Sequence, residues 1–210
     1  MTGQSMSTDD PSTESPAVVR RLESVNASTL GEMVETFEEL QMVLRCCERL
    51  VSELHASEEP DDVVVEAIWT TALLSYARCF REGVPGAALS EEDVTSTRPE
   101  SDVLDWHRVL IQLRDHYADP SASPRERFTV GVTQGSDGAP SGVAITSARQ
   151  PLVDDVTVRQ TGAIAYALSG LVNQRIEAQQ LEVSVELESV SQTDLDKLVS
   201  LEVATASTPA

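Results

Sequence analysis

Apolar side chains recur at alternating spacings of three and four residues over the first long stretch of the chain. The positions are Leu30, Met33, Phe37, Leu40, Leu44, Cys47, Val51 and Leu54. This spacing predicts an amphipathic helix of about seven turns from about Ser28 to His55, with Ser28 or Thr29 as its N-cap. The stripe fits either a coiled-coil dimer seam or the first helix of an intramolecular bundle. We favour the bundle, because more helices follow closely.

Two further helices are predicted downstream of this stripe. Pro60 and the two acids after it are typical of a helix start. The run from Val64 to Phe80 is apolar on nearly all sides, which is typical of a central helix. After a polar loop over 91–100, with room for one helical turn, a third helix is expected from about Ser101 to Tyr117. Pro120 ends it, because proline cannot continue a helix.

The periodicity changes from helical to alternating after residue 127. Apolar residues alternate with small or polar ones on both sides of the turn sequence 135–138, which predicts a β-hairpin at about 127–147. A short third strand is expected around Leu152. A long last helix is then predicted from Asp154 to about Gln180, and four small residues on it would let a neighbouring backbone approach closely: Gly162, Ala163, Ala167 and Gly170.

The chain beyond this helix is less regular. Residues 181–190 alternate as a strand does, and the pattern leaves strand and helix both open. A short terminal helix is expected from Asp194 to Val203. Residues 1–28 are rich in Ser, Thr, Pro and acids, and we predict that they are disordered. We therefore expect a mainly α fold: a helical bundle of about four main helices with a β-hairpin insertion, formed by residues 29–203 as a single domain, with a tail at 204–210.

Charge and composition limit the partners of this fold. The 210 residues include 35 acids and 15 bases, for a formal net charge of −20, and Lys197 is the only lysine. Such a surface repels phosphate backbones and anionic lipid, so non-specific nucleic-acid binding is not expected. The composition fits either adaptation to high salt or a coding bias toward arginine. No stretch reaches the ~18 apolar residues of a membrane span, and no signal pattern opens the chain, so we expect a cytoplasmic protein.

The sequence predicts no cofactor and no metal site, because it has no phosphate-binding glycine loop, no zinc-ligand spacing and no nucleophile elbow. Cys46, Cys47 and Cys79 are interpreted as buried small apolar residues in a reducing compartment.

The candidate chemistry lies in the third helix. His107 and Arg114 are seven residues apart and share a face that also carries apolar residues, so this face points inward. A buried arginine needs a carboxylate or several carbonyls as partners, and Asp119 or an acid of the second helix could supply the carboxylate. One interpretation is a structural ion pair, and the other is a functional site.

Two segments carry a resemblance to a known family. They are the run Trp69-Thr-Thr-Ala-Leu-Leu-Ser-Tyr-Ala-Arg-Cys-Phe80 and the run Leu113-Arg-Asp-His-Tyr-Ala-Asp119, with His107 and Leu110 between them. They resemble small bacterial proteins of the HEPN superfamily, over roughly residues 60–180. The resemblance implies a helical bundle that dimerises. It also implies a motif of arginine, four to six residues and histidine that often serves metal-independent RNA cleavage.

This sequence departs from the motif at the residue that matters for cleavage. Arg114 matches the arginine, which would stabilise phosphate, but Asp119 stands where histidine is expected and His116 lies only two residues beyond the arginine. An aspartate is a poor general acid at neutral pH and repels phosphate. We therefore expect a degenerate, non-catalytic interaction or regulatory module with a protein partner or as a homodimer. One alternative is an RNase toxin or defence effector that uses Arg114 with His107 or His116. The other is an assembly protein that works through the first helix.

Overall fold

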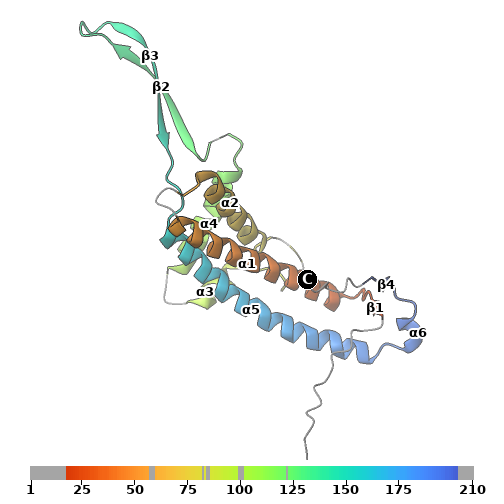
Figure 1. Ribbon diagram of the computed structural model, residues 1–210. Helices are drawn as coiled ribbons and strands as arrows, with labels where there is room; N and C mark the ends of the chain where they lie inside the picture. Colours follow the sequence, from red (N-terminus) through yellow and green to blue (C-terminus); the bar gives the residue numbers. More distant parts are fainter. Residues whose placement is uncertain are drawn as a thin grey trace, which may run out of the picture.

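The computed structural model describes residues 18–56, 60–81, 83, 86–98, 102–121 and 123–202. This part of the chain forms a mainly α bundle with a projecting β-hairpin, as the sequence predicts (Figure 1). Its elements are β1 (Val19–Arg20), α1 (Val25–Ala56), α2 (Asp62–Arg78), α3 (Glu91–Thr97), α4 (Val103–Ala118), β2 (Glu126–Gln134), β3 (Pro140–Arg149), α5 (Asp155–Glu188), α6 (Gln192–Leu195) and β4 (Ser200–Leu201).

The helices follow one another around the bundle. Helix α1 packs against α5 on one side and α2 on the other, α2 packs against α4, and the short α3 bridges α4 and α5. Helices α1 and α5 run antiparallel along nearly their whole lengths. Gln179 donates to the carbonyl of Asn26 at one end, and His55 lies 3.8 Å from Asp155 at the other. Helices α4 and α5 make few direct contacts, so the bundle is open on this side.

The predicted stripe of α1 packs inside the chain. Met33, Leu40 and Cys47 are buried, whereas the remaining members of the stripe are only partly buried. The fully buried arc of α1 also includes Val43 and Leu50. The arc is wider than a coiled-coil seam because α1 contacts two helices, α2 and α5, at once.

Ordered structure begins earlier than the sequence suggests. Strand β1 pairs antiparallel with β4, and α1 begins at Val25 rather than near residue 28. The hydroxyl of Ser24 accepts a hydrogen bond from the backbone N–H of Ala27, so Ser24 caps the helix in place of Ser28 or Thr29. The predicted disorder of residues 1–28 is therefore wrong for 18–28. Residues 1–17 lie outside the described residues.

The segment predicted as a polar loop contains α3. Ser90 and Asp93 form a reciprocal capping box at its start, and Val94 is buried. Asp93 also forms an ion pair with Arg175, which ties α3 to α5.

The end of the chain differs from the prediction. Residues 181–188 continue α5 as helix, because the first residues of α1 run beside them and Ser24 and Asn26 donate to the carboxylate of Glu186. The terminal helix is shorter than expected: α6 ends at Leu195, and strand β4 follows where helix was predicted up to residue 203. Leu152 lies in an irregular linker and not in a third strand, while residues 203–210 lie outside the described residues.

Among the described residues, no helix is both long enough and apolar enough to cross a bilayer. The three cysteines are free and buried, and burial raises the pKa of Cys47 and Cys79 to about 12. Their thiols therefore act as core packing groups, as the sequence predicts.

Candidate functional site on helix α4

His107 lies in the core between α2 and α4. Its Nδ1 is 2.9 Å from the hydroxyl of Tyr76, and its ring packs against Phe80 with a centroid distance of 4.4 Å. The side chain is only 5% exposed. Burial lowers the pKa of His107 below its ordinary value of 6.5, an effect that the nearby Glu91 carboxylate opposes. His107 is therefore neutral at pH 7 and joins two helices by a hydrogen bond.

Next to His107, the outer side of α4 forms a charged hydrogen-bonded pair with α3. The guanidinium of Arg108 donates to both carboxylate oxygens of Glu91, with a closest distance of 3.1 Å. This hydrogen-bonded pair holds the pKa of Glu91 below its ordinary value. The pair is exposed and so contributes little to the free energy of unfolding, but it fixes α3 over the start of α4.

Arg114 does not form the buried ion pair that the sequence suggests. Its side chain is 36% exposed, and its Nε lies 2.9 Å from the carboxylate of its neighbour Asp115. The N–H is not aligned for a hydrogen bond, which leaves a buried donor without an acceptor. The expected partners do not contact it: Asp119 bonds elsewhere, and the side chain borders a small cavity of about 100 Å³ with Leu73 and Tyr117.

His116 and Asp119 are exposed at the C-terminal end of α4. Asp119 ends the helix and accepts hydrogen bonds from the backbone N–H and hydroxyl of Ser121, at 2.8 and 2.7 Å. These bonds hold the pKa of Asp119 below its ordinary value, with a smaller contribution from His116. Asp119 is therefore an ionised turn-forming residue at neutral pH and cannot donate a proton to a leaving group.

The structure separates the candidate residues into two groups. His107 sits opposite Tyr76 and Phe80 inside the bundle, whereas Arg114, His116 and Asp119 lie about two to three turns further along α4. A rise of about 1.5 Å per residue puts His107 and Arg114 about 10 Å apart along the helix. They share a face of α4, as predicted, but they contact different residues of α2 and do not meet.

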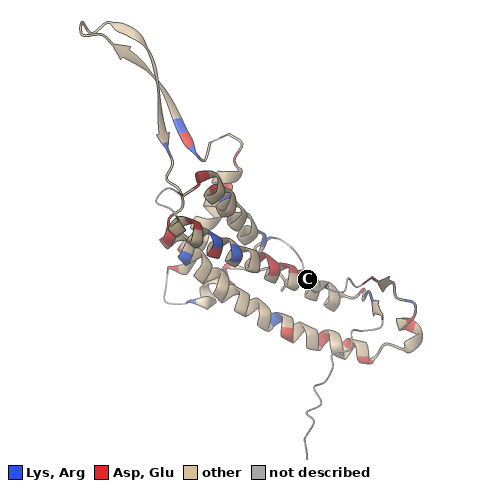
Figure 2. Ribbon diagram, in the orientation of Figure 1, with Lys and Arg blue, Asp and Glu red and all other residues tan. Residues whose placement is uncertain are grey.

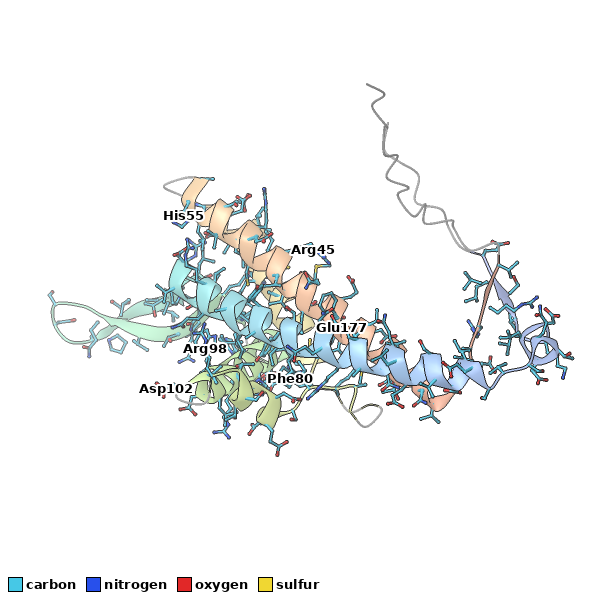
Figure 3. All side chains as sticks on the ribbon, turned by 90° about the horizontal axis from the view of Figure 1, so that it is seen from below. Arg45, His55, Phe80, Arg98, Asp102 and Glu177 are labelled. Carbon is cyan, nitrogen blue, oxygen red and sulfur yellow. The ribbon has the colours of Figure 1, made fainter. Side chains whose placement is uncertain are left out.

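A groove between α4 and α5 was not predicted. It has a volume of about 590 Å³, and its walls come from the first half of α4 and from α5. Figure 3 shows Arg98 and Asp102, which belong to its rim, beside α5. Ala163 and Ala167, two of the small residues predicted to admit a close helix, instead face this open space. Only Gly162 lies at a close helix contact, against Cys47 of α1.

Sequence reasoning missed Tyr76 as the partner of His107, although both lie on apolar helix faces. It also missed the groove, because the pattern of one helix does not say how far away its neighbour stands. No group of three or more His, Cys, Asp or Glu residues within the described ranges could hold a metal ion. Comparison with protein-family models, with curated proteins and with solved structures finds no match to this chain.

Proposed function

We propose that this chain is a non-catalytic, HEPN-like interaction or regulatory module. The observation that carries the proposal is the position of His107. Of the two histidines that could act as a general base with Arg114, His107 is buried and hydrogen-bonded to Tyr76, about two turns from Arg114. The other, His116, is two residues from Arg114 and so points to another face of α4. A base must reach the proton that it removes, and His107 has no exposed path to a substrate.

The charge distribution supports the same proposal. The chain carries a net charge of −20, and Asp119 adds an ionised carboxylate at the position where the motif needs a histidine. Acidic residues are spread over the helices in Figure 2, so a phosphate backbone would meet a repulsive surface. The exposed surface is better suited to protein contacts than to RNA.

An RNase is the second candidate, and one observation favours it. The Arg114 side chain is 36% exposed and His116 is exposed, both near the C-terminal end of α4. A solvent-accessible guanidinium can bind a phosphate oxygen. The third candidate, assembly through α1, is less favoured, because α1 is flanked by α2 and α5 within the chain.

Binding of a non-cleavable RNA tests the proposal. A fluorescent oligoribonucleotide with 2′-O-methyl groups should show no anisotropy change with up to about 100 μM protein at about 0.1 M salt. Any affinity would then be weaker than that of usual non-specific RNA binding. The Arg114→Ala variant should behave in the same way. Micromolar binding by the wild type that weakens at least about tenfold in the variant would instead favour the RNase.

A further inference from the structure

The β-hairpin has one apolar face that none of the described residues covers. The antiparallel register pairs Val130 with Ile145 and Val132 with Val143, and Phe128 lies on the same side two residues before Val130. Directly paired residues point to the same face of a sheet. These five side chains are 62–74% exposed. The opposite face carries small and polar residues such as Thr129 and Thr146, so the hairpin is apolar on one side only.

The hairpin is held away from its own bundle. At its base, Arg125 forms an ion pair with Glu66 at 2.7 Å, and Arg149 forms one with Asp62, so both strands are anchored to the start of α2. From there the two strands project into solvent beyond the helices (Figure 1). An isolated two-stranded sheet is marginally stable in water. A covering partner would therefore stabilise the hairpin as well as bind it.

The part of the chain that the structure describes also contains a groove with largely apolar walls, which none of these residues fills. Val103, Trp106 and Val109 of α4 line one wall, and Ala163 and Ala167 of α5 line the other. The groove exists because α4 and α5 are bridged mainly by α3 and because the α5 side chains here are small. An apolar insert would release the water from the groove volume of about 590 Å³.

We propose that the hairpin of one copy inserts its apolar face into the α4/α5 groove of a second copy, and reciprocally, to form a two-fold dimer. This inference rests on the proposed role as an interaction module and names the partner. The segment 126–149 contains two acids and two arginines and thus has no net charge, in a chain of net charge −20. Figure 2 shows these charges mostly at the hairpin base. The hairpin can therefore approach a second copy without the repulsion that acts between the acidic helices.

The rim of the groove is also balanced in charge. Arg98 and Arg159 lie on it together with Asp102 and Asp105. Both surfaces of the proposed contact are thus neutral overall and apolar at their centres, which matches the usual anatomy of a protein interface.

The buried area favours reciprocal exchange over contact between two hairpin faces. A strand of nine residues is about 30 Å long and a two-stranded sheet about 10 Å wide, so one hairpin face covers about 300 Å². A single contact on a face of this size is no larger than a packing contact. Reciprocal exchange makes two such contacts and so doubles the buried area.

Sedimentation velocity of the full chain and of matched variants tests this dimer. The wild type should dimerise between about 1 and about 100 μM. Val130→Asp on the apolar face should weaken the dimer by about 30-fold or more, because it removes a central apolar contact and adds a buried charge. Thr129→Asp adds the same charge to the opposite face of the same strand and should leave the dimer intact. Ala167→Trp fills the groove and should also give monomers, with Val109→Asp as a second groove variant.

Mixing two defective variants separates this arrangement from other dimers. Val130→Asp keeps an intact groove, and Ala167→Trp keeps an intact hairpin, so the mixture restores one of the two contacts. Because one contact is the size of a packing contact, the mixture should associate more weakly than the wild type but more strongly than either variant alone. The proposal is overturned if the wild type is monomeric, if both groove variants dimerise like the wild type, if Thr129→Asp is as damaging as Val130→Asp, or if the mixture associates no more strongly than either variant alone. Each of these failures leaves the RNA-binding result, and hence the non-catalytic role, unaffected.

Discussion

His107 and Arg114 occupy one helix, and their neighbours give them different roles. His107 has almost no contact with water because α2 covers it, and its Nδ1 forms a hydrogen bond with the Tyr76 hydroxyl. Arg114 keeps about a third of its side chain in solvent and forms an ion pair with its neighbour Asp115. The structural role that the sequence suggested for Arg114 therefore belongs to His107.

The pH dependence of stability should report the burial of His107. Because the pKa of His107 is below 6.5 in the folded chain, the unfolded chain binds a proton below about pH 6.5 that the folded chain does not. The free energy gained from neutral His107 is thus complete above about pH 6.5 and falls as the pH drops toward the lowered pKa. We expect the difference in unfolding free energy between wild type and His107→Gln to shrink from about pH 7.5 to about pH 5.5.

Urea unfolding of both proteins at several pH values measures this difference. His55 and His116 are present in both proteins, so their contributions cancel. Parallel stability curves would show that His107 binds its proton equally well in the folded and unfolded chains, which contradicts its burial against Tyr76 and Phe80.

The sequence could predict which residues of α4 face inward, but not what they meet. A spacing of seven residues is enough to place His107 and Arg114 on one face. The partners depend on the alignment of α4 against α2, which no local pattern specifies. Asp119 shows the same limit of sequence-based prediction. It could bond to Arg114 if the helix continued, but the helix ends at Asp119 and Ser121 donates hydrogen bonds to its carboxylate.

At the scale of elements, patterns with a strong period were predicted well. The stripe of α1 and the alternation of the hairpin each follow one period over many residues, and both elements exist close to their predicted bounds. The alternation at 181–190 was misleading, because polar and apolar residues can alternate by chance on an exposed helix. There the helix depends on contacts with α1, such as those of Glu186 with Ser24 and Asn26.

Alanine substitutions in α1 should distinguish its core arc from the flanking part of the stripe. Leu40 is fully buried between the helices, whereas Leu44 is only partly buried. Leu40→Ala should lower the unfolding free energy by about 2–5 kcal/mol, because it leaves a cavity in a packed core. Leu44→Ala should cost clearly less. Chemical denaturation at two protein concentrations measures both effects, and equal losses for the two variants would mean that α1 is rotated from the observed orientation.

At the scale of the whole molecule, acidic helices surround an apolar core and a neutral hairpin projects from one end. The sequence shows the net charge and the apolar alternation, but the separation of the hairpin from the bundle depends on the ion pairs of Arg125 and Arg149 with α2. The open side between α4 and α5 depends likewise on how the helices are spaced. The surfaces available for binding are therefore properties of the assembled fold rather than of any one segment.

Incubation of the purified chain with total RNA in EDTA tests the central claim most directly. We expect no cleavage by the wild type or by Arg114→Ala, because His107 is buried, Asp119 cannot act as the acid, and His116 points to another face of α4 than Arg114. The variant should lose no more than about 1 kcal/mol of unfolding free energy, because its ion pair is partly exposed. Cleavage by the wild type that disappears in Arg114→Ala, with the melting temperature unchanged, would contradict the account and establish the chain as an RNase.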